Sequence, residues 1–146
     1  MATITFLRRS DNKNVGSIGS VIAYCVQEKK TQYMNARLIS GINCLPETAM
    51  KEFVSTKKRF GKTDGVQFYH AVQSFGKGEN VNPYLAHSIA REWAERCYPD
   101  HEILIATHTD TDNIHSHIII NSVNMNTGYK IHQNGNDIKD MRKVND

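Results

Sequence analysis

Several features are scarce in this chain, and each absence narrows what the protein can be. Its 146 residues include only three cysteines, Cys25, Cys44 and Cys97, at irregular spacings. An odd, irregular set fits neither a disulfide framework nor a zinc ribbon, which indicates reduced thiols. No apolar run in the sequence approaches the roughly 20 residues of a membrane span. The first residues lack the basic start and long apolar core of a signal peptide. We therefore expect a cytoplasmic protein without a membrane span.

The excess of positive over negative charge is also small. The net charge is only +3, which permits binding to nucleic acid without requiring it. The basic residues nevertheless form two clusters, Lys29 and Lys30, and Lys57, Lys58 and Arg59. Each cluster alone is as well explained by a solvated surface as by contacts to phosphates. If they are phosphate contacts, they would position DNA without reading its bases.

Internal repeats, low-complexity tracts and long linkers are absent, so we expect a single domain over residues 1–146. Residues 139–146 resemble the opening of a helix that stops at the chain end. This pattern favours the N-terminal part of a longer protein.

Hydrophobic periodicity predicts strands and helices in a mixed order. Strands are expected at residues 3–7, 66–75, 102–108, 115–123 and 129–132, and helices at 17–28, at 45–60 and from Pro83 to before Pro99. Asn82 is the expected cap of the third helix, and Gly61 the expected end of the second. This order predicts an α+β domain: an antiparallel sheet of about five strands with helices packed mainly on one face.

The first predicted helix carries a candidate nucleophile. Ile18, Val21, Ile22 and Cys25 recur at the spacing of one buried face, and Tyr24 falls on the flank of that stripe. A phenol there can reach past the edge of the core. By pattern alone Tyr24 competes with five other tyrosines, and a helix-flank tyrosine is usually a packing residue.

The most informative segment runs from His108 to Asn121 and contains three histidines. His115 and His117 are two apart on a predicted strand, so their imidazoles project from the same face. A hairpin would bring His108 to the same end of that face, which we expect to stay open while Ile118 and Ile120 dock against helices. The three would then offer neutral nitrogen ligands to a divalent ion, with positions left free for substrate. His-x-His pairs also occur by chance in ordinary strands.

Second contacts and the choice of metal follow from the same segment. Asp110 or Asp112, in the connecting turn, could accept the other ring N–H of a histidine ligand. Imidazoles suit Zn²⁺, Ni²⁺ and Mn²⁺, whereas Mg²⁺ prefers oxygen, so three histidines do not identify the working metal. We expect Mg²⁺ or Mn²⁺ in function, with Zn²⁺ or Ni²⁺ as possible bound ions. His70 is either a core histidine or a neighbour of this site.

Three segments together resemble a known family. The pattern H-x-D-x4-H-x-H-x3-N from His108 resembles the third motif of mobilization relaxases, the VirD2-like group of HUH endonucleases. Residues 69–79, with Ser74-Phe75 before a turn, resemble the second motif, and residues 22–31 resemble the first, which carries a tyrosine nucleophile. The motifs occur in family order across about residues 15–130. One position departs from the broad class: Ser116 stands where a bulky hydrophobic residue is usual.

The resemblance implies an activity and assigns roles. Tyr24 would attack a phosphodiester at an origin of transfer, leaving a 5′-phosphotyrosyl link and a free 3′-hydroxyl. His108, His115 and His117 would hold the metal, and Ser74 and Asn121 would lie near the site or its DNA. The implied partners are single-stranded or hairpin DNA at the transfer origin, and accessory DNA-binding and coupling proteins.

Three other interpretations stay open. A replication initiator or transposase of the same endonuclease class shares the chemistry but usually carries its tyrosine after the histidines. A metal-dependent hydrolase would use activated water and would survive Tyr24→Phe. A non-enzymatic single-strand binder with structural zinc should need a closed set of four ligands, which the sequence lacks.

Overall fold

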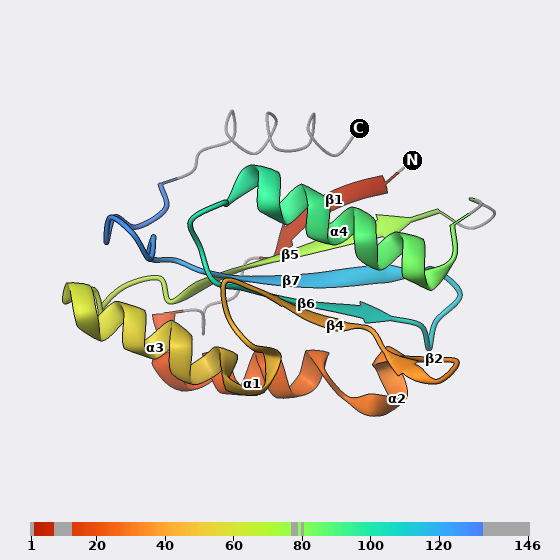
Figure 1. The fold of residues 1–146 in the computed structure, drawn as a ribbon, viewed down its shortest axis with the longest axis horizontal. Helices are drawn as coiled ribbons and strands as arrows, with labels where there is room; N and C mark the ends of the chain where they lie inside the picture. Colours follow the sequence, from red (N-terminus) through yellow and green to blue (C-terminus); the bar gives the residue numbers. More distant parts are fainter. Residues whose placement is uncertain (1, 8–12, 77–78, 80, 133–146) are drawn as a thin grey trace.

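Five antiparallel strands form the central sheet of the computed structural model, which describes residues 2–7, 13–76, 79 and 81–132 (Figure 1). The strand order is β1-β5-β7-β6-β4. The strands are β1 (Ala2–Leu7), β4 (Ile39–Ile42), β5 (Phe68–Phe75), β6 (Ile103–His108) and β7 (His115–Asn121). Every neighbouring pair runs antiparallel. The predicted α+β class with a five-stranded antiparallel sheet is confirmed.

Helices cover both faces of this sheet. They are α1 (Val15–Cys25), α2 (Glu28–Thr31), α3 (Ala49–Phe60) and α4 (Pro83–Cys97), with a short 3-10 helix, η2 (Pro46–Thr48). Figure 1 shows α1, α2 and α3 on one side and α4 on the other. We expected helices mainly on one face, and three of the four do share one. The second layer exists because β7 is apolar in both directions: Ile118 and Ile120 pack towards α4, and Ile119 towards α1 and α3.

Local signals in the sequence set most helix boundaries. The Asn82 side chain accepts a hydrogen bond from the Leu85 backbone N–H at 2.8 Å, and Pro83 occupies the first turn of α4. Gly61 ends α3 in the left-handed conformation, with φ at 67°. Both predictions are confirmed. Helix α1 ends at Cys25, three residues before the end that the sequence predicted, Glu28. Helix α2 begins at Glu28 as a separate turn.

The fifth strand is not the one expected. Residues 129–132 form only an isolated bridge, between Lys130 and Val123, and the sheet is completed by β4. A small hairpin of β2 (Gln32–Tyr33) and β3 (Ala36–Arg37) precedes β4. These short elements have too few alternating residues to register as a periodic pattern. The expected helix opening at 139–146 lies outside the described residues.

No helix within the described ranges has the length and apolarity needed to cross a lipid bilayer.

Candidate functional site

Three histidines meet on the face of the sheet that α1 covers. β6 and β7 pair so that His108 lies directly opposite His115, and Ala106 opposite His117. The three rings therefore project from one face at one end of the hairpin. One ligand nitrogen from each ring lies within 4.8 Å of the others. The ring centroids are 4.3 to 5.2 Å apart.

Main-chain carbonyls orient two of these rings. His108 Nε2 lies 2.9 Å from the Cys25 carbonyl oxygen, and His115 Nδ1 lies 3.0 Å from that of Asn113. A carbonyl can only accept, so each bonded nitrogen carries the proton and the other ring nitrogen carries a lone pair. This is the form in which histidine binds a metal.

Asp110 does not have the role that we expected of it. Carbonyls accept the second N–H of His108 and His115, and Asp110 instead pairs with Lys30 at 3.4 Å. A carbonyl at the end of α1 already occupies the acceptor position beside His108, which leaves Asp110 to act on that ring only through its charge. Burial lowers the pKa of His108, the nearby His115 lowers it further, and the Cys25 carbonyl and Asp110 oppose the shift.

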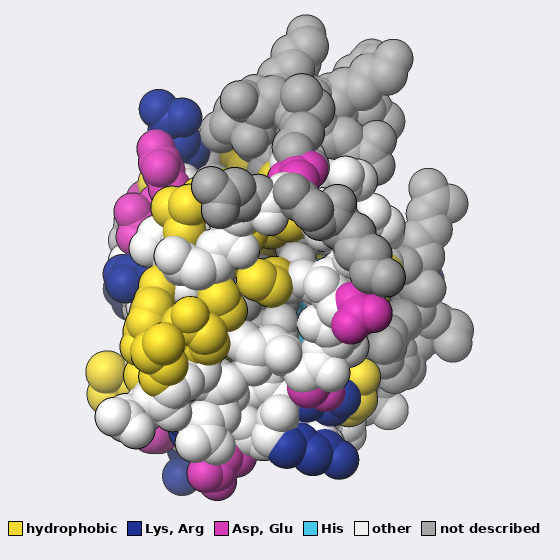
Figure 2. All heavy atoms as spheres, turned by 90° about the vertical axis from the view of Figure 1, so that its right-hand side faces the viewer, with side chains coloured by type: hydrophobic (Ala, Val, Ile, Leu, Met, Phe, Trp, Pro, Cys, Tyr) yellow, Lys and Arg dark blue, Asp and Glu magenta, His cyan; other side chains and the backbone are white. Residues whose placement is uncertain are grey.

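The histidine face is less open than the sequence predicted. His108 is 2% exposed and His117 9%, and only His115 is partly exposed. Figure 2 looks at the end of the molecule where β6 ends and β7 begins, and hardly any histidine colour reaches its surface. The cover is the last turn of α1, whose Ile22 and Cys25 pack in the same core cluster as Ala106. The packing of α1 therefore covers most of the histidine face.

Tyr24 lies beside the histidines. It occupies the last turn of α1 and is 48% exposed. Its ring centroid lies 6.2 Å from that of His108 and 6.4 Å from that of His117. Lys30 Nζ lies 5.0 Å from the centre of the phenol ring. The structure thus places the candidate nucleophile beside the histidines and under a positive charge.

Ser74 lies with the histidines, whereas Asn121 does not. Ser74 pairs directly with His115 across β5 and β7, so both side chains share the face. Asn121 is six residues beyond His115 on β7, roughly 20 Å along the strand. It is fully buried, and its amide donates to the Phe53 carbonyl and to Glu102. The expectation that Asn121 neighbours the metal site is therefore wrong.

The second basic cluster is divided. Lys58 and Arg59 are exposed, but Lys57 is 1% exposed and cannot contact DNA as we expected. Its ammonium donates to the Gln67 carbonyl, the Asn121 amide oxygen and the Ser122 hydroxyl; we call these four residues the buried lysine cluster. Burial lowers the pKa of Lys57 to about 7, Lys130 adds to the shift and Glu102 opposes it. The spacing of four from Phe53 is the signal that places Lys57 on the buried face of α3.

The first basic cluster adjoins the site instead. Lys29 is exposed, and Lys30 holds the loop after His108 through its carbonyl, which accepts from the Thr109 N–H at 2.7 Å. Figure 1 shows α2 at the end where β6 finishes, and the C-terminal end of α3 at the opposite end. Lys58 and Arg59, which end α3, are therefore far from Tyr24.

Ser116, the departure from the class pattern, has buried partners on the other face. Its hydroxyl lies 2.7 Å from that of Thr107, and the Thr107 hydroxyl lies 2.8 Å from His87 Nδ1. His87 Nε2 in turn lies 2.6 Å from the Ser40 hydroxyl. Burial lowers the pKa of His87 to about 4, so this ring stays neutral near pH 7. A polar residue at 116 is stable here because Thr107 of β6 is its hydrogen-bonding partner, and His87 of α4 in turn bonds Thr107.

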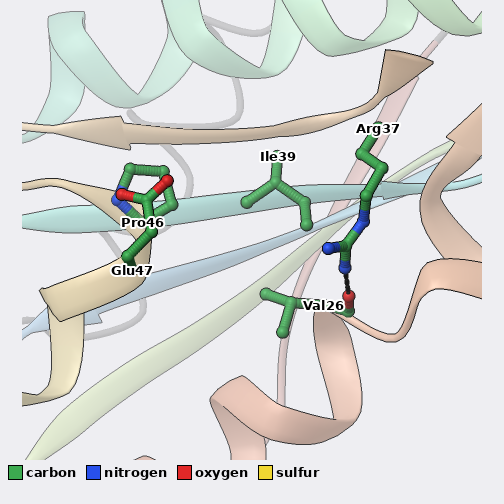
Figure 3. Close-up of a pocket in the computed structure, with 5 residues that line it drawn as sticks. All are labelled: Val26, Arg37, Ile39, Pro46 and Glu47. Atoms are coloured by element: carbon green, nitrogen blue, oxygen red, sulfur yellow. Dashed lines mark hydrogen bonds between the residues drawn. The ribbon is translucent and has the colours of Figure 1, made fainter. Parts of the chain in front are cut away.

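A separate pocket adjoins the C-terminal end of α1. It has a volume of about 320 Å³ and is lined by Val26, Arg37, Ile39, Pro46 and Glu47. Figure 3 shows Arg37 pointing to the Val26 carbonyl, to which its guanidinium donates a hydrogen bond. Because Val26 caps α1, this contact helps to hold the turn that carries Tyr24. No histidine lines the pocket.

His70, which the sequence left as either a core histidine or a neighbour of the site, and Cys25 both lie against the histidines. His70 on β5 is buried, with Nε2 2.7 Å from His117 Nδ1. Ligand atoms of Cys25, His70 and His117 also lie within 4.8 Å of one another. The alternation of β5 placed His70 and Ser74 on one face, but no sequence signal indicated which strand would lie beside it.

Comparison with known proteins gives the same family as the motifs. A family model described as "Relaxase: MobA/VirD2-like, nuclease domain" matches residues 24–146. The chain is 38% identical over 107 residues to Protein rlx of Staphylococcus aureus, covering 73% of this chain and 32% of that protein. It is 29% identical to the group II intron-interrupted relaxase LtrB of Lactococcus lactis, covering 81% and 25% of the two chains. With Protein TraI of Escherichia coli it shares 32% identity, covering 53% and 10%. The chain thus spans about a third or less of the length of these relatives.

Proposed function

Because the chain belongs to the MobA/VirD2-like relaxase nuclease family, we propose that it nicks one strand of DNA at an origin of transfer. Tyr24 is the nucleophile and His108, His115 and His117 are the metal ligands. The observation that carries this proposal is the position of the exposed phenol, with its ring about 6 Å from two of the three histidine rings.

The donor set fits a divalent ion. Three imidazoles converge, and two of them are held by carbonyls with a lone pair on the second nitrogen. A divalent ion bound there would neutralise charge on a non-bridging phosphoryl oxygen and fix the phosphate for in-line attack. Neutral ligands suit this task because they leave the charge of the ion undiminished. Mn²⁺ and Mg²⁺ remain our choice for the working metal.

Tyr24 would carry out the cleavage itself. Its phenolic oxygen forms a bond to phosphorus while the bond to the preceding 3′-oxygen breaks. The phenolic proton passes to a base, and the departing 3′-oxygen takes up a proton. The products are a 5′-phosphotyrosyl adduct and a free 3′-hydroxyl, so the bond energy is kept and the strand can be rejoined.

Basic residues beside the phenol would hold the strand. Lys30 lies over the Tyr24 ring, and Lys29, the preceding residue in the chain, is exposed. Both can therefore contact phosphates that flank the scissile one. Ser74 would contact the DNA near the metal, and its position opposite His115 supports this. Accessory and coupling proteins stay a prediction from the resemblance, as does a cytoplasmic location.

The test is an adduct assay with an oligonucleotide spanning the cognate transfer origin. We expect a denaturation-resistant protein–DNA adduct that requires a divalent ion. Tyr24→Phe should abolish the adduct and leave binding of the oligonucleotide within about threefold, because the ring remains and only the attacking oxygen is lost.

Tyr129→Phe is the matched control, because Tyr129 is 74% exposed and lies near the C-terminal end of the described residues. An adduct that persists in Tyr24→Phe would move the nucleophile elsewhere. DNA cleavage that persists without an adduct would favour a hydrolase that uses activated water.

A further inference from the structure

His70 contacts one of the three proposed ligands from the neighbouring strand. β5 pairs with β7 so that His70 lies opposite Ile119 and Val72 opposite His117. His70 therefore sits one diagonal step from His117 on the same face. Its Nε2 is 2.7 Å from His117 Nδ1, and the ring is 2% exposed. This is a direct hydrogen bond between two buried imidazoles.

We infer that His70 is a positioning residue that fixes the tautomer of His117 and so completes the metal site; this rests on the proposed function. A neutral imidazole carries one N–H and one lone pair. If His117 Nδ1 donates to His70, then His117 Nε2 carries a lone pair and can bind an ion. If His70 donates instead, His117 Nε2 carries the proton and cannot.

His117 needs such a partner more than the other two rings do. Carbonyls, which can only accept, orient His108 and His115. The partner of His117 Nδ1 is another imidazole, which can donate or accept. Ion binding at Nε2 of His117 selects the arrangement in which His70 accepts. Without His70 as acceptor, ion binding at His117 Nε2 would leave the buried Nδ1–H of His117 without this hydrogen bond. That loss weakens binding of the ion.

A rival arrangement uses the same residues differently. Ligand atoms of Cys25, His70 and His117 lie within 4.8 Å, so an ion bound there would make His70 a ligand. A thiolate favours a soft ion such as Cd²⁺ or Zn²⁺ over Mn²⁺. All three residues are buried, whereas His115 of the other set is partly exposed and offers the ion a path. Mn²⁺ therefore discriminates between the two arrangements.

The experiment measures Mn²⁺ affinity by calorimetry on the full chain without DNA. His70→Gln and His70→Asn form a matched pair, because both carry an amide but only the longer glutamine brings its oxygen to the position of Nε2. We expect His70→Asn to lose about 10- to 100-fold in affinity and His70→Gln to stay within about threefold of the wild type. His70→Leu, which has no acceptor, should match His70→Asn, and the melting temperature of each metal-free variant checks folding.

Two reference variants, His115→Ala and Cys25→Ser, distinguish failure of the inferred His70 role from failure of the three-histidine site. His115→Ala should lose more affinity than His70→Asn, and Cys25→Ser should lose none. Wild-type affinity in His70→Asn or His70→Leu, or equal loss in His70→Gln, would overturn the role of His70. If His115→Ala binds Mn²⁺ normally, the three-histidine site itself fails, and with it the proposed function. Loss in Cys25→Ser with normal binding in His115→Ala would place the ion at the rival site.

Discussion

Two buried polar clusters lie at opposite ends of β7, and they differ in how their polar atoms are used. In the buried lysine cluster the ammonium is paired within the cluster: Lys57 donates to three oxygens, and Asn121, which accepts from Lys57, also donates to Glu102. At the histidine end His108 and His115 donate to main-chain carbonyls, so the other nitrogen of each ring carries a lone pair. A cation that is paired inside the fold helps to hold the fold together, whereas ring nitrogens that converge to within 4.8 Å of one another are suited to bind an ion.

The largest difference between the two ends should appear in metal binding. We expect His115→Ala to lower divalent-ion affinity and nicking together by at least about 100-fold, because one of three ligands is lost. Its stability without metal should change little, since His115 is partly exposed. Calorimetry and the adduct assay measure the two effects. An unchanged nicking rate would remove His115 from the ligand set.

The reverse pattern is expected at the lysine end. Lys57→Met should lower the free energy of unfolding by about 2–4 kcal/mol, because it removes the hydrogen bonds that Lys57 donates to buried oxygens of Gln67 and Asn121. Mn²⁺ affinity should not change. Urea denaturation measures the loss, and Lys58→Met, on the exposed neighbour, should stay within about 0.5 kcal/mol of the wild type. A stable Lys57→Met variant with weakened DNA binding would instead restore Lys57 as a phosphate contact.

The smallest difference should appear in DNA affinity. Lys30→Ala should weaken binding of single-stranded DNA and reduce the slope of log affinity against log salt by about one, because one phosphate contact is lost. Lys58→Ala should leave that slope unchanged, because α3 ends far from the histidines (Figure 1). Fluorescence anisotropy across a salt series gives both slopes. Equal slopes in the two variants would mean that the strand path extends to the far end of the sheet.

The sequence predicted the convergence of the three histidines more completely than it predicted the order of strands in the sheet around them. The spacing of His115 and His117, and the short turn back to His108, determine one face of one hairpin, so their convergence follows from local geometry alone. Asn121 lies on the same strand as those histidines, but its distance from them exceeds the reach of any side chain. A shared motif therefore does not imply a shared site.

What the sequence could not provide was contact between segments far apart in the chain. His70 meets His117 across 47 residues, and the Cys25 carbonyl meets His108 across 83. No periodicity encodes which strand becomes the neighbour of β7, and the order β5-β7-β6 is settled by packing of the whole core. The turn acids stood out in the sequence as charged acceptors, whereas every residue has a carbonyl and none is marked as the one that will be used.

The most direct test of the central claim is to digest the covalent DNA adduct with trypsin and identify the modified peptide by mass spectrometry. Trypsin should release residues 14–29 as one peptide, in which Tyr24 is the only tyrosine. If Tyr24 is the nucleophile, the nucleotide should be found on this peptide. Its presence on residues 31–37, which contain Tyr33, or on 63–77, which contain Tyr69, would contradict the account.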